Sequence, residues 1–254
     1  MSGPWEIILG DCVEIMRDME PASFDFIFAD PPYHLSNGGF SVKSGRQVSV
    51  NKGDWDSSAG IEADFAFHQS WIENCLRLLT DDGSMMISGT YHSIYSCGSI
   101  LQKLDARIIN EIVWFKPNGA PALGGRNFTA SHETIIWASK SRKSKHTFNY
   151  QESKDFDHQG DNLKNPGKQM RSVWSIPSTP SSEKRHGQHP TQKPLRLLER
   201  IVSLCTNPGD KILDPFCGSG TTGVAAITMN RHFIGIEEDS TYAELARKRM
   251  AEIL

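Results

Sequence analysis

The sequence predicts an α/β fold, with a mostly parallel sheet covered by helices on both faces. Short apolar runs typical of buried strands alternate with segments whose apolar residues recur at helical spacing. A glycine-rich loop at residues 214–223 also separates an apolar run from a helical segment. With 254 residues and 38% hydrophobic content, the chain is long enough for one domain, residues 1–254, with a sizeable core.

The elements of the first half are read from changes in periodicity and from the turn residues that bound each run. The expected strands are residues 5–9, 24–29, 84–88, 107–115 and 134–138. The expected helices are residues 12–19, 62–79 and 92–104. Pro21 ends the first of these helices because proline cannot continue one.

The second half is read in the same way. The expected helices are residues 194–206, 221–229 and 240–253, and the expected strands are residues 211–213 and 232–236. Residues 33–60 interrupt the alternation: they are rich in Gly, Ser and Asn and predict a long mobile loop, which in a compact domain usually serves function.

Residues 140–190 form a second interruption, in which apolar runs vanish and basic residues accumulate. From residue 140 to residue 196 there are 12 Lys and Arg against 5 Asp and Glu, a balance of +7. Since the whole chain carries −3, the remainder carries −10. Composition alone favours a solvated, partly disordered insertion, while the sharper hypothesis is a surface that contacts phosphate.

Cysteine usage and hydropathy indicate the compartment. The five cysteines are scattered and never form a CxxC pair, which predicts buried free thiols and disfavours a metal site or a disulfide framework. No apolar stretch approaches the length of a membrane span, and the first residues lack a cationic signal-peptide flank. We expect a soluble cytoplasmic protein that needs no metal.

The loop DPFCGSGTTG, residues 214–223, contains G-x-G-x-x-G between a strand and a helix. Glu237 ends the next strand, 19 positions after Gly218, which is the spacing of a nucleoside-binding βαβ unit. A nicotinamide-dependent oxidoreductase is one interpretation. Asp214 opposes it, because a carboxylate repels a pyrophosphate and suits an ammonium group. S-adenosylmethionine carries an ammonium and a sulfonium and no phosphate, so the charge favours that cofactor.

A second motif, DPPY at residues 30–33, follows the second strand. The exocyclic amino group of a nucleobase is a weak nucleophile, because its lone pair is delocalised into the ring. The Asp30 carboxylate and the Pro31 carbonyl can accept hydrogen bonds from both of its N–H bonds, and the two prolines restrict the backbone that aims these acceptors. Tyr33 offers a flat face for a base that has left the stack.

Together, in this order, the two motifs resemble the β group of DNA amino-methyltransferases, in which the catalytic half precedes the cofactor half. The stretches IILGD (7–11), HPTQKPLRLLERIV (189–202) and FIGIE (233–237) extend the likeness. The resemblance implies a Rossmann-like, circularly permuted, S-adenosylmethionine-dependent methyltransferase fold with a seven-stranded sheet. It also implies that residues 33–60 contact DNA and that residues 140–190 are a DNA-recognition insertion.

A narrower likeness is to the second methyltransferases of Dpn-type restriction systems. It rests on ADPPYHLSNGG with QVSVNKGDWD (47–56), on FTASHETIIWASK (128–140) and on GKQMRSVW (167–174). It implies methylation of adenine N6 in GATC, on double-stranded and also on single-stranded DNA. A cognate restriction endonuclease and a second copy of the chain are the further partners considered, and no membrane is expected.

The resemblance assigns roles residue by residue. The expected catalytic residues are Asp30, Pro31, Pro32 and Tyr33. The expected cofactor-binding residues are Asp11, Asp30, Thr191, Lys193, Asp214, Pro215, Phe216, Gly218, Ser219, Gly220, Thr221, Thr222 and Glu237. The expected DNA contacts are His34, Ser36, Asn37, Lys52, Trp55, Arg126, Arg142, Lys143, Lys145, Lys168, Arg171, Lys184 and Arg185.

The motifs also bear on three alternative functions. Cytosine-N4 transfer uses the same chemistry, and remains an alternative although that group more often has serine in place of Asp30. A catalytically inert DNA-binding module predicts broken motifs, whereas residues 30–33 are intact. Cytosine-C5 transfer needs a reactive cysteine, and Cys217 lies in the glycine loop rather than in a nucleophile motif.

Overall fold

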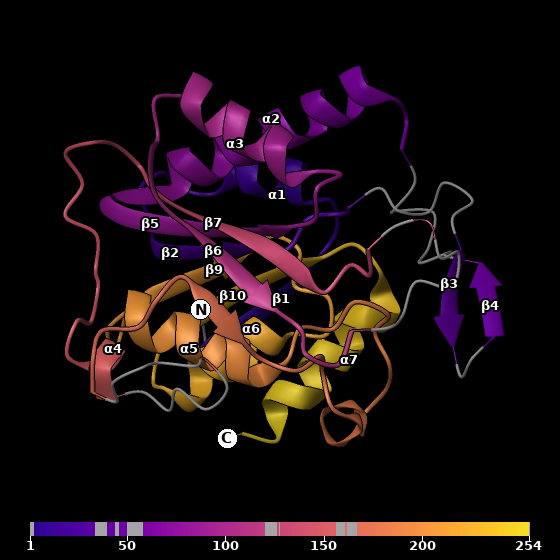
Figure 1. Ribbon diagram of the computed structural model, residues 1–254. Helices are drawn as coiled ribbons and strands as arrows, with labels where there is room; N and C mark the ends of the chain where they lie inside the picture. Colours follow the sequence, from indigo (N-terminus) through magenta and orange to yellow (C-terminus); the bar gives the residue numbers. More distant parts are fainter. Residues whose placement is uncertain are drawn as a thin grey trace.

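Eight strands form one mixed sheet in the order β1-β10-β9-β2-β5-β7-β6-β8 (Figure 1). The computed structural model describes residues 3–33, 40–43, 46–49, 58–119, 126, 128–155, 161 and 167–253. The strands of the sheet are β1 (Trp5–Leu9), β2 (Phe24–Ala29), β5 (Leu79–Gly89), β6 (Arg107–Phe115), β7 (His132–Ser139), β8 (Val173–Ser175), β9 (Lys211–Asp214) and β10 (His232–Glu237). All neighbouring strands run parallel except β7, which is antiparallel to both β5 and β6.

Helices cover both faces of this sheet, as the alternation of elements predicts (Figure 1). The helices are α1 (Cys12–Asp18), α2 (Ile61–Leu78), α3 (Ile94–Lys103), α4 (Glu152–Asp155), α5 (Leu195–Cys205), α6 (Thr221–Thr228) and α7 (Ser240–Ala251), with a short 3₁₀ helix at Ser181–Lys184. Helices α1, α2 and α3 lie on one face, and α5, α6 and α7 lie on the other. None of the helices described is long and apolar enough to cross a membrane.

The central strand β2 shows how the sequence builds two cores. Phe26 and Phe28 belong to the apolar cluster that contains α5, α6 and α7, whereas Ile27 and Ala29 belong to the cluster that contains α1, α2 and α3. All four side chains are almost fully buried. Because successive side chains of a strand point to opposite faces, a strand buried on both faces is apolar throughout.

The expected cysteine chemistry is confirmed. All five cysteines are free and buried. Burial raises the pKa of Cys97 to about 12, and it raises the pKa of the other four as well. These thiols therefore stay protonated at neutral pH and act as small apolar side chains.

Part of the expected loop at residues 33–60 is a hairpin. Strand β3 (Phe40–Lys43) pairs antiparallel with β4 (Arg46–Ser49) as a separate two-stranded sheet. Four-residue strands are too short for periodicity to reveal them, although Ser44-Gly45 between them is a turn signal. The remainder of this expected loop up to residue 57 lies, apart from residue 33, outside the described residues.

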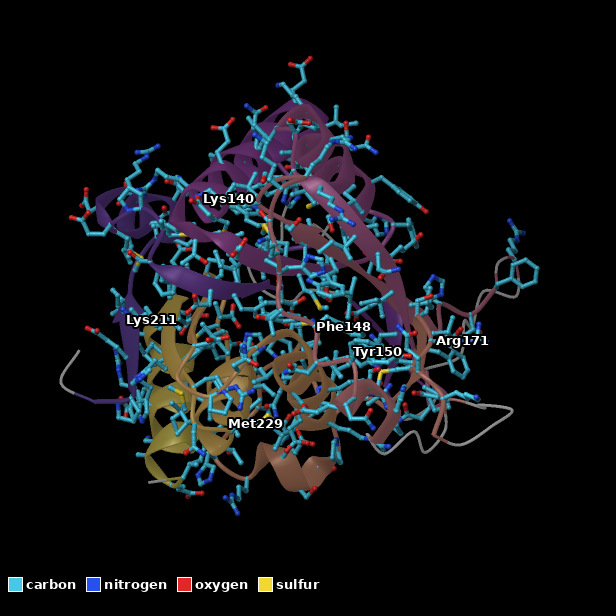
Figure 2. The ribbon with its side chains drawn as sticks, turned by 90° about the vertical axis from the view of Figure 1, so that its left-hand side faces the viewer. Lys140, Phe148, Tyr150, Arg171, Lys211 and Met229 are labelled. Atoms are coloured by element: carbon cyan, nitrogen blue, oxygen red, sulfur yellow. The ribbon has the colours of Figure 1, made fainter. Side chains whose placement is uncertain are left out.

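The expected insertion at residues 140–190 is packed onto the domain where it is described. From Lys140 it runs down the side of the molecule to Tyr150 and α4, which lies beside α5 (Figures 1 and 2). The Asn149 amide group donates hydrogen bonds to two carbonyl oxygens at the end of α5. Strand β8 then extends the sheet beside β6, so that the sheet has one strand more than expected. Single buried residues such as Trp174 anchor the segment, and they leave no periodic signal in the sequence.

Candidate active site

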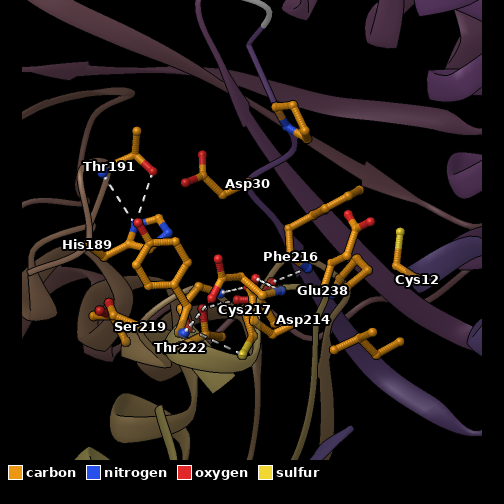
Figure 3. A pocket seen from close by; sticks show the side chains of 18 of the residues that line it. Cys12, Asp30, His189, Thr191, Asp214, Phe216, Cys217, Ser219, Thr222 and Glu238 are labelled. Carbon is orange, nitrogen blue, oxygen red and sulfur yellow. Dashed lines mark hydrogen bonds between the residues drawn. The ribbon is translucent and has the colours of Figure 1, made fainter. Parts of the chain in front are cut away.

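The candidate site lies where the strand order of the sheet reverses. From β9 the chain passes through α6 to β10 on one side, and from β2 it passes through α2 to β5 on the other. Strands β9 and β2 are neighbours, so their carboxyl ends diverge into helices on opposite faces. A cavity of about 590 Å³ opens at this point, a volume suited to a small-molecule ligand (Figure 3).

The glycine loop forms the floor of the cavity. Gly220 has a left-handed backbone with φ +75° and precedes α6, and a Cβ atom there would lie 2.9 Å from the Cβ atom of Ala246. Arg249 of α7 holds the loop from below, because its guanidinium donates to the Ser219 carbonyl at 2.6 Å and to the Thr221 hydroxyl at 3.0 Å. The loop is therefore preorganised by packing and hydrogen bonds.

Asp214, at the end of β9, is buried beneath this loop. It accepts hydrogen bonds from the Thr222 hydroxyl at 2.6 Å and from the Phe216 backbone N–H at 3.0 Å. Burial nevertheless raises its pKa to about 7. A cation bound beside Asp214 would favour its ionised form.

Two further acids at strand ends border the cavity. Glu237 ends β10 and accepts the backbone N–H of Gly218 at 2.7 Å. Asp11 follows β1 and caps α1 by accepting the Glu14 N–H at 2.8 Å. Both side chains thus have fixed positions, and the carboxyl ends of four adjacent strands supply Asp11, Glu237, Asp214 and Asp30.

The chemistry of this lining fits S-adenosylmethionine. Within the described part of the chain, six acidic residues line the cavity: Asp11, Asp30, Asp214, Glu237, Glu238 and Asp239. Against these acids, the described lining has one lysine, Lys193, and one histidine, His189. Such an excess of carboxylates opposes the pyrophosphate of a dinucleotide and suits a ligand that carries a sulfonium and an ammonium. Phe67 and Tyr242 add aromatic surface from α2 and α7.

Asp30 enters the cavity from the opposite wall, at the end of β2 (Figure 3). It forms an ion pair with Lys193, which stands just before α5. Asp30 and Asp214 are 184 positions apart in the chain, yet they line the same cavity, as the two motifs predict.

Behind Asp30 lies a buried polar cluster that the sequence motifs do not reveal. The Tyr33 hydroxyl donates to Asp30, lies 3.0 Å from Ser88 Oγ, and lies 3.0 Å from Glu133 Oε2. Glu133 also forms an ion pair with Lys116, and its Oε2 atom lies 3.7 Å from Lys193 Nζ. The cluster thus joins two carboxylates to two ammonium groups.

The two carboxylates of this cluster differ in acidity. Burial raises the pKa of Asp30; the charge of Lys193 opposes this shift and Glu133 adds to it, so the pKa stays above its ordinary value. Burial would also raise the pKa of Glu133, but the charges of Lys193 and Lys116 outweigh it and lower the pKa to about 2. Glu133 is therefore the more firmly ionised of the two.

Most expected cofactor residues come together here. All of them line the cavity except Gly220, which shapes the loop from beneath. Among the expected catalytic residues, Asp30 and Pro32 line the cavity, whereas Pro31 and Tyr33 are buried next to it. Phe67, His189 and Tyr242 complete the wall, and the rings of His189 and Tyr242 meet edge to face at 4.2 Å. Phe67 and Tyr242 lie within helices, where a lone aromatic residue usually indicates only core packing.

The expected DNA contacts fall into several groups. His34, Ser36, Asn37, Lys52 and Trp55 lie outside the described residues. Arg126 is exposed between β6 and β7, whose adjoining ends lie at the same edge of the sheet as Asp30. Lys168 and Arg171 are exposed before β8, Lys184 is half-buried, and Arg185 is paired with Glu252.

Arg142, Lys143 and Lys145 do not lie near the site. They follow the end of β7 at the opposite edge of the sheet, where the Lys145 N–H donates to Asp82 and the Arg142 guanidinium lies 4.0 Å from Asp105. They therefore lie away from the cavity, and their contact with DNA phosphate stays a prediction, which the salt dependence of DNA binding tests. Net charge showed that the segment is basic, but not which edge of the sheet it reaches.

The chain was compared with known proteins. The model of the N6/N4 methyltransferase family, described as DNA methylase, matches residues 24–248. The chain is 46% identical over 245 residues to the type II methyltransferase M2.DpnII of Streptococcus pneumoniae. The matched region covers 96% of this chain and 88% of that protein. The chain is also 43% identical over 249 residues to the type II methyltransferase M2.MboI of Moraxella bovis, covering 98% and 88%.

A solved structure shows the same fold. The crystal structure of M1.HpyAVI in complex with S-adenosylmethionine superposes with a TM-score of 0.70 at 29% identity, and the match covers 97% of this chain and 98% of that one. The expected permuted methyltransferase fold is confirmed by this match and by the order of Asp30 and the glycine loop along the chain. The chain belongs to the N6/N4 family of DNA methylases and is a DNA methyltransferase.

Proposed function

We propose that this enzyme transfers the methyl group of S-adenosylmethionine to N6 of adenine in DNA, within the sequence GATC, on double-stranded and also on single-stranded DNA. One observation carries the proposal: Asp30 and the glycine-loop acid Asp214 line the same cavity. The cavity therefore holds both an acceptor for the target amino group, Asp30, and an acid that suits a cationic cofactor, Asp214.

The methyl donor is S-adenosylmethionine, which supplies an electrophilic methyl group on a sulfonium. Asp214, Glu237 and Asp11 are the residues that would hold it, with the residues 191–193 at the side of Asp30. This assignment rests on the acidic lining described above and on the sequence motifs. Phe67 and Phe216 contribute apolar wall to the same cavity.

Asp30 and the Pro31 carbonyl accept the two N–H bonds of the target amino group and orient its lone pair. In-line displacement then needs only positioning and electrostatic stabilisation, without a covalent intermediate on the protein. The proton of the methylated amino group leaves to solvent. Tyr33 stacks on the adenine, which must leave the helix to reach the cavity.

The target base is tested by incubating unmethylated DNA with the enzyme and labelled cofactor and then identifying the modified nucleoside by mass spectrometry. N6-methyladenine confined to GATC is the expected product. N4-methylcytosine as the product would instead establish the N4 alternative that the same chemistry allows. Equal assays on single-stranded and double-stranded oligonucleotides, with GATC and with a scrambled site, test the preference for strand and sequence.

The relatives are type II methyltransferases, which supports the first two of three further inferences. The enzyme acts in the cytoplasm, it protects the host DNA against a cognate restriction endonuclease, and a second copy of the chain is a candidate partner. Protection of GATC sites in cells that express the enzyme tests the second inference. Sedimentation of the enzyme with and without DNA tests the third.

A further inference from the structure

Both oxygens of the Asp30 carboxylate are occupied by groups of the protein itself. The Lys193 ammonium contacts Oδ2, and the Tyr33 hydroxyl donates to Oδ1. Under the proposed function, on which this inference rests, Asp30 accepts a hydrogen bond from the target amino group. The target amino group must therefore compete with these two donors for the lone pairs of Asp30, because each oxygen already accepts one donor.

Lys193 stands in the way of the base at two points. Besides contacting Asp30, its Nζ atom lies over the ring of Tyr33, 5.2 Å from the ring centroid. That ring is proposed to stack on the adenine, yet Tyr33 is only 5% exposed. Moving Lys193 would remove the ammonium both from the acceptor oxygen and from its place over the ring.

Lys193 cannot simply be released. Its side chain is 6% exposed, and a buried ammonium left without a carboxylate is strongly destabilised. Residues within reach must therefore supply another anion. Among the described residues, the carboxylates within ion-pair distance of Lys193 are those of Asp30 and Glu133.

Glu133 is placed to receive the ammonium. Its Oε2 atom lies 3.7 Å from Lys193 Nζ and 3.0 Å from the Tyr33 hydroxyl. An ammonium held at this oxygen would lie at the hydroxyl end of the tyrosine ring rather than over its face. The charges of Lys193 and Lys116 keep the pKa of Glu133 at about 2 against the effect of burial, so the carboxylate is ionised at neutral pH.

We propose that Glu133 is a positioning residue that takes over the Lys193 ammonium, and retains the Tyr33 hydroxyl, when the target amino group binds Asp30. The exchange conserves the charges of the cluster, since one ammonium moves between two carboxylates. Lys116, paired with the other oxygen of Glu133, holds the receiving carboxylate in place. Glu133 itself does not touch the reacting atoms.

The test compares methyl transfer by the wild type with transfer by Glu133→Gln, which keeps the shape of the side chain and removes its charge. The single-turnover rate on GATC-containing DNA at saturating S-adenosylmethionine should fall about tenfold or more, because Lys193 then stays on Asp30. The dissociation constant for S-adenosylmethionine should stay within about threefold of the wild type. Glu111→Gln on the neighbouring strand β6, an exposed glutamate, is the matched control and should leave the rate unchanged.

A second background separates this role from a structural one. In Lys193→Gln no ammonium has to move, so adding Glu133→Gln should lower the single-turnover rate no further. Rate losses that multiply, or a rate for Glu133→Gln equal to that of the wild type, would overturn the proposal. Loss of cofactor affinity in parallel with the rate would overturn it too.

Two additional comparisons keep the outcome decisive. Glu133→Asp retains the charge and should give a rate between those of the wild type and Glu133→Gln. If Glu133→Gln does not fold, Glu133→Asp takes its place in the comparison with and without Lys193→Gln. A loss by Glu133→Asp that persists in full on the Lys193→Gln background contradicts the proposal. Wild-type methylation is scored first, because an inactive wild type contradicts the proposed function, whereas an active wild type matched by Glu133→Gln contradicts only the role of Glu133.

Discussion

At the scale of single residues, burial decides how the acids of the cavity behave. Asp214 is 2% exposed, and two hydrogen bonds do not compensate for its loss of water, so its pKa rises to about 7. Asp214 is therefore partly protonated near neutral pH. A cationic ligand would lower the pKa of Asp214 and offset the cost of burying its charge, because it favours the ionised carboxylate.

The Asp214→Asn variant should show this effect as a change in the pH dependence of stability. Between pH 4 and pH 7 the unfolded aspartate is ionised while the folded one keeps its proton, so the free energy of unfolding falls as pH rises through this window. Asparagine does not titrate. From pH 5 to pH 8 the wild type should therefore lose about 3 kcal/mol relative to Asp214→Asn. Urea denaturation of both proteins at the two pH values measures the difference, and parallel pH profiles would refute the assignment.

At the scale of elements, α6 is held unusually close to the sheet and to α7. Gly223 makes this approach possible, because a Cβ atom there would lie 2.3 Å from Met250 Sδ and 2.6 Å from the buried ring of Phe233. The close contact fixes the first turn of α6, and with it the glycine loop that borders the cavity.

Gly223→Ala should therefore destabilise the protein by about 1–3 kcal/mol through overpacking. Gly98→Ala is the matched control: Gly98 lies inside α3, where a Cβ atom would meet only the flexible end of Ile136 at 3.2 Å. That variant should be neutral or stabilised by up to about 1 kcal/mol through helix propensity. Thermal unfolding of both variants provides the comparison, and equal stability of the two would contradict the packing explanation.

At the scale of the whole molecule, the two edges of the sheet have different tasks. The carboxyl ends of β1, β10, β9, β2 and β5 share one edge, which holds Asp30 and the cavity. Residues 140–145 lie at the other edge, beside Asp81 and Asp82. We therefore expect the phosphate contacts around the target base at the first edge, although residues 140–145 at the second edge are basic.

The salt dependence of DNA binding should distinguish these edges. Arg126 lies between β6 and β7, whose adjoining ends are at the edge that holds Asp30. Arg126→Ala should reduce the slope of log affinity against log salt by about 1, as expected for one lost phosphate contact. The triple variant Arg142→Ala, Lys143→Ala, Lys145→Ala should leave the slope unchanged. Titrations of fluorescent DNA at several salt concentrations give both slopes. A reduced slope in the triple variant would place DNA on the far edge as well.

The sequence predicts the fold and most of the cavity because both depend on local patterns. Strands β1, β2 and β6 have the predicted bounds, and the glycine loop and Asp30 lie in one cavity as their motifs imply. Strand β8 and the partners of Tyr33 were not predictable in this way. Trp174 and Glu133 act through neighbours that are distant in the chain, and no spacing rule connects them to the site.

Asp30 is the residue on which the whole account depends, since it joins the amino-group acceptor to the cofactor cavity. The most direct measurement compares the wild type with Asp30→Ala in two assays, single-turnover methyl transfer to GATC-containing DNA and calorimetric binding of S-adenosylmethionine. The account predicts that Asp30→Ala loses methyl transfer by about 1,000-fold or more, while cofactor binding is largely retained. Near-normal turnover by Asp30→Ala would contradict it.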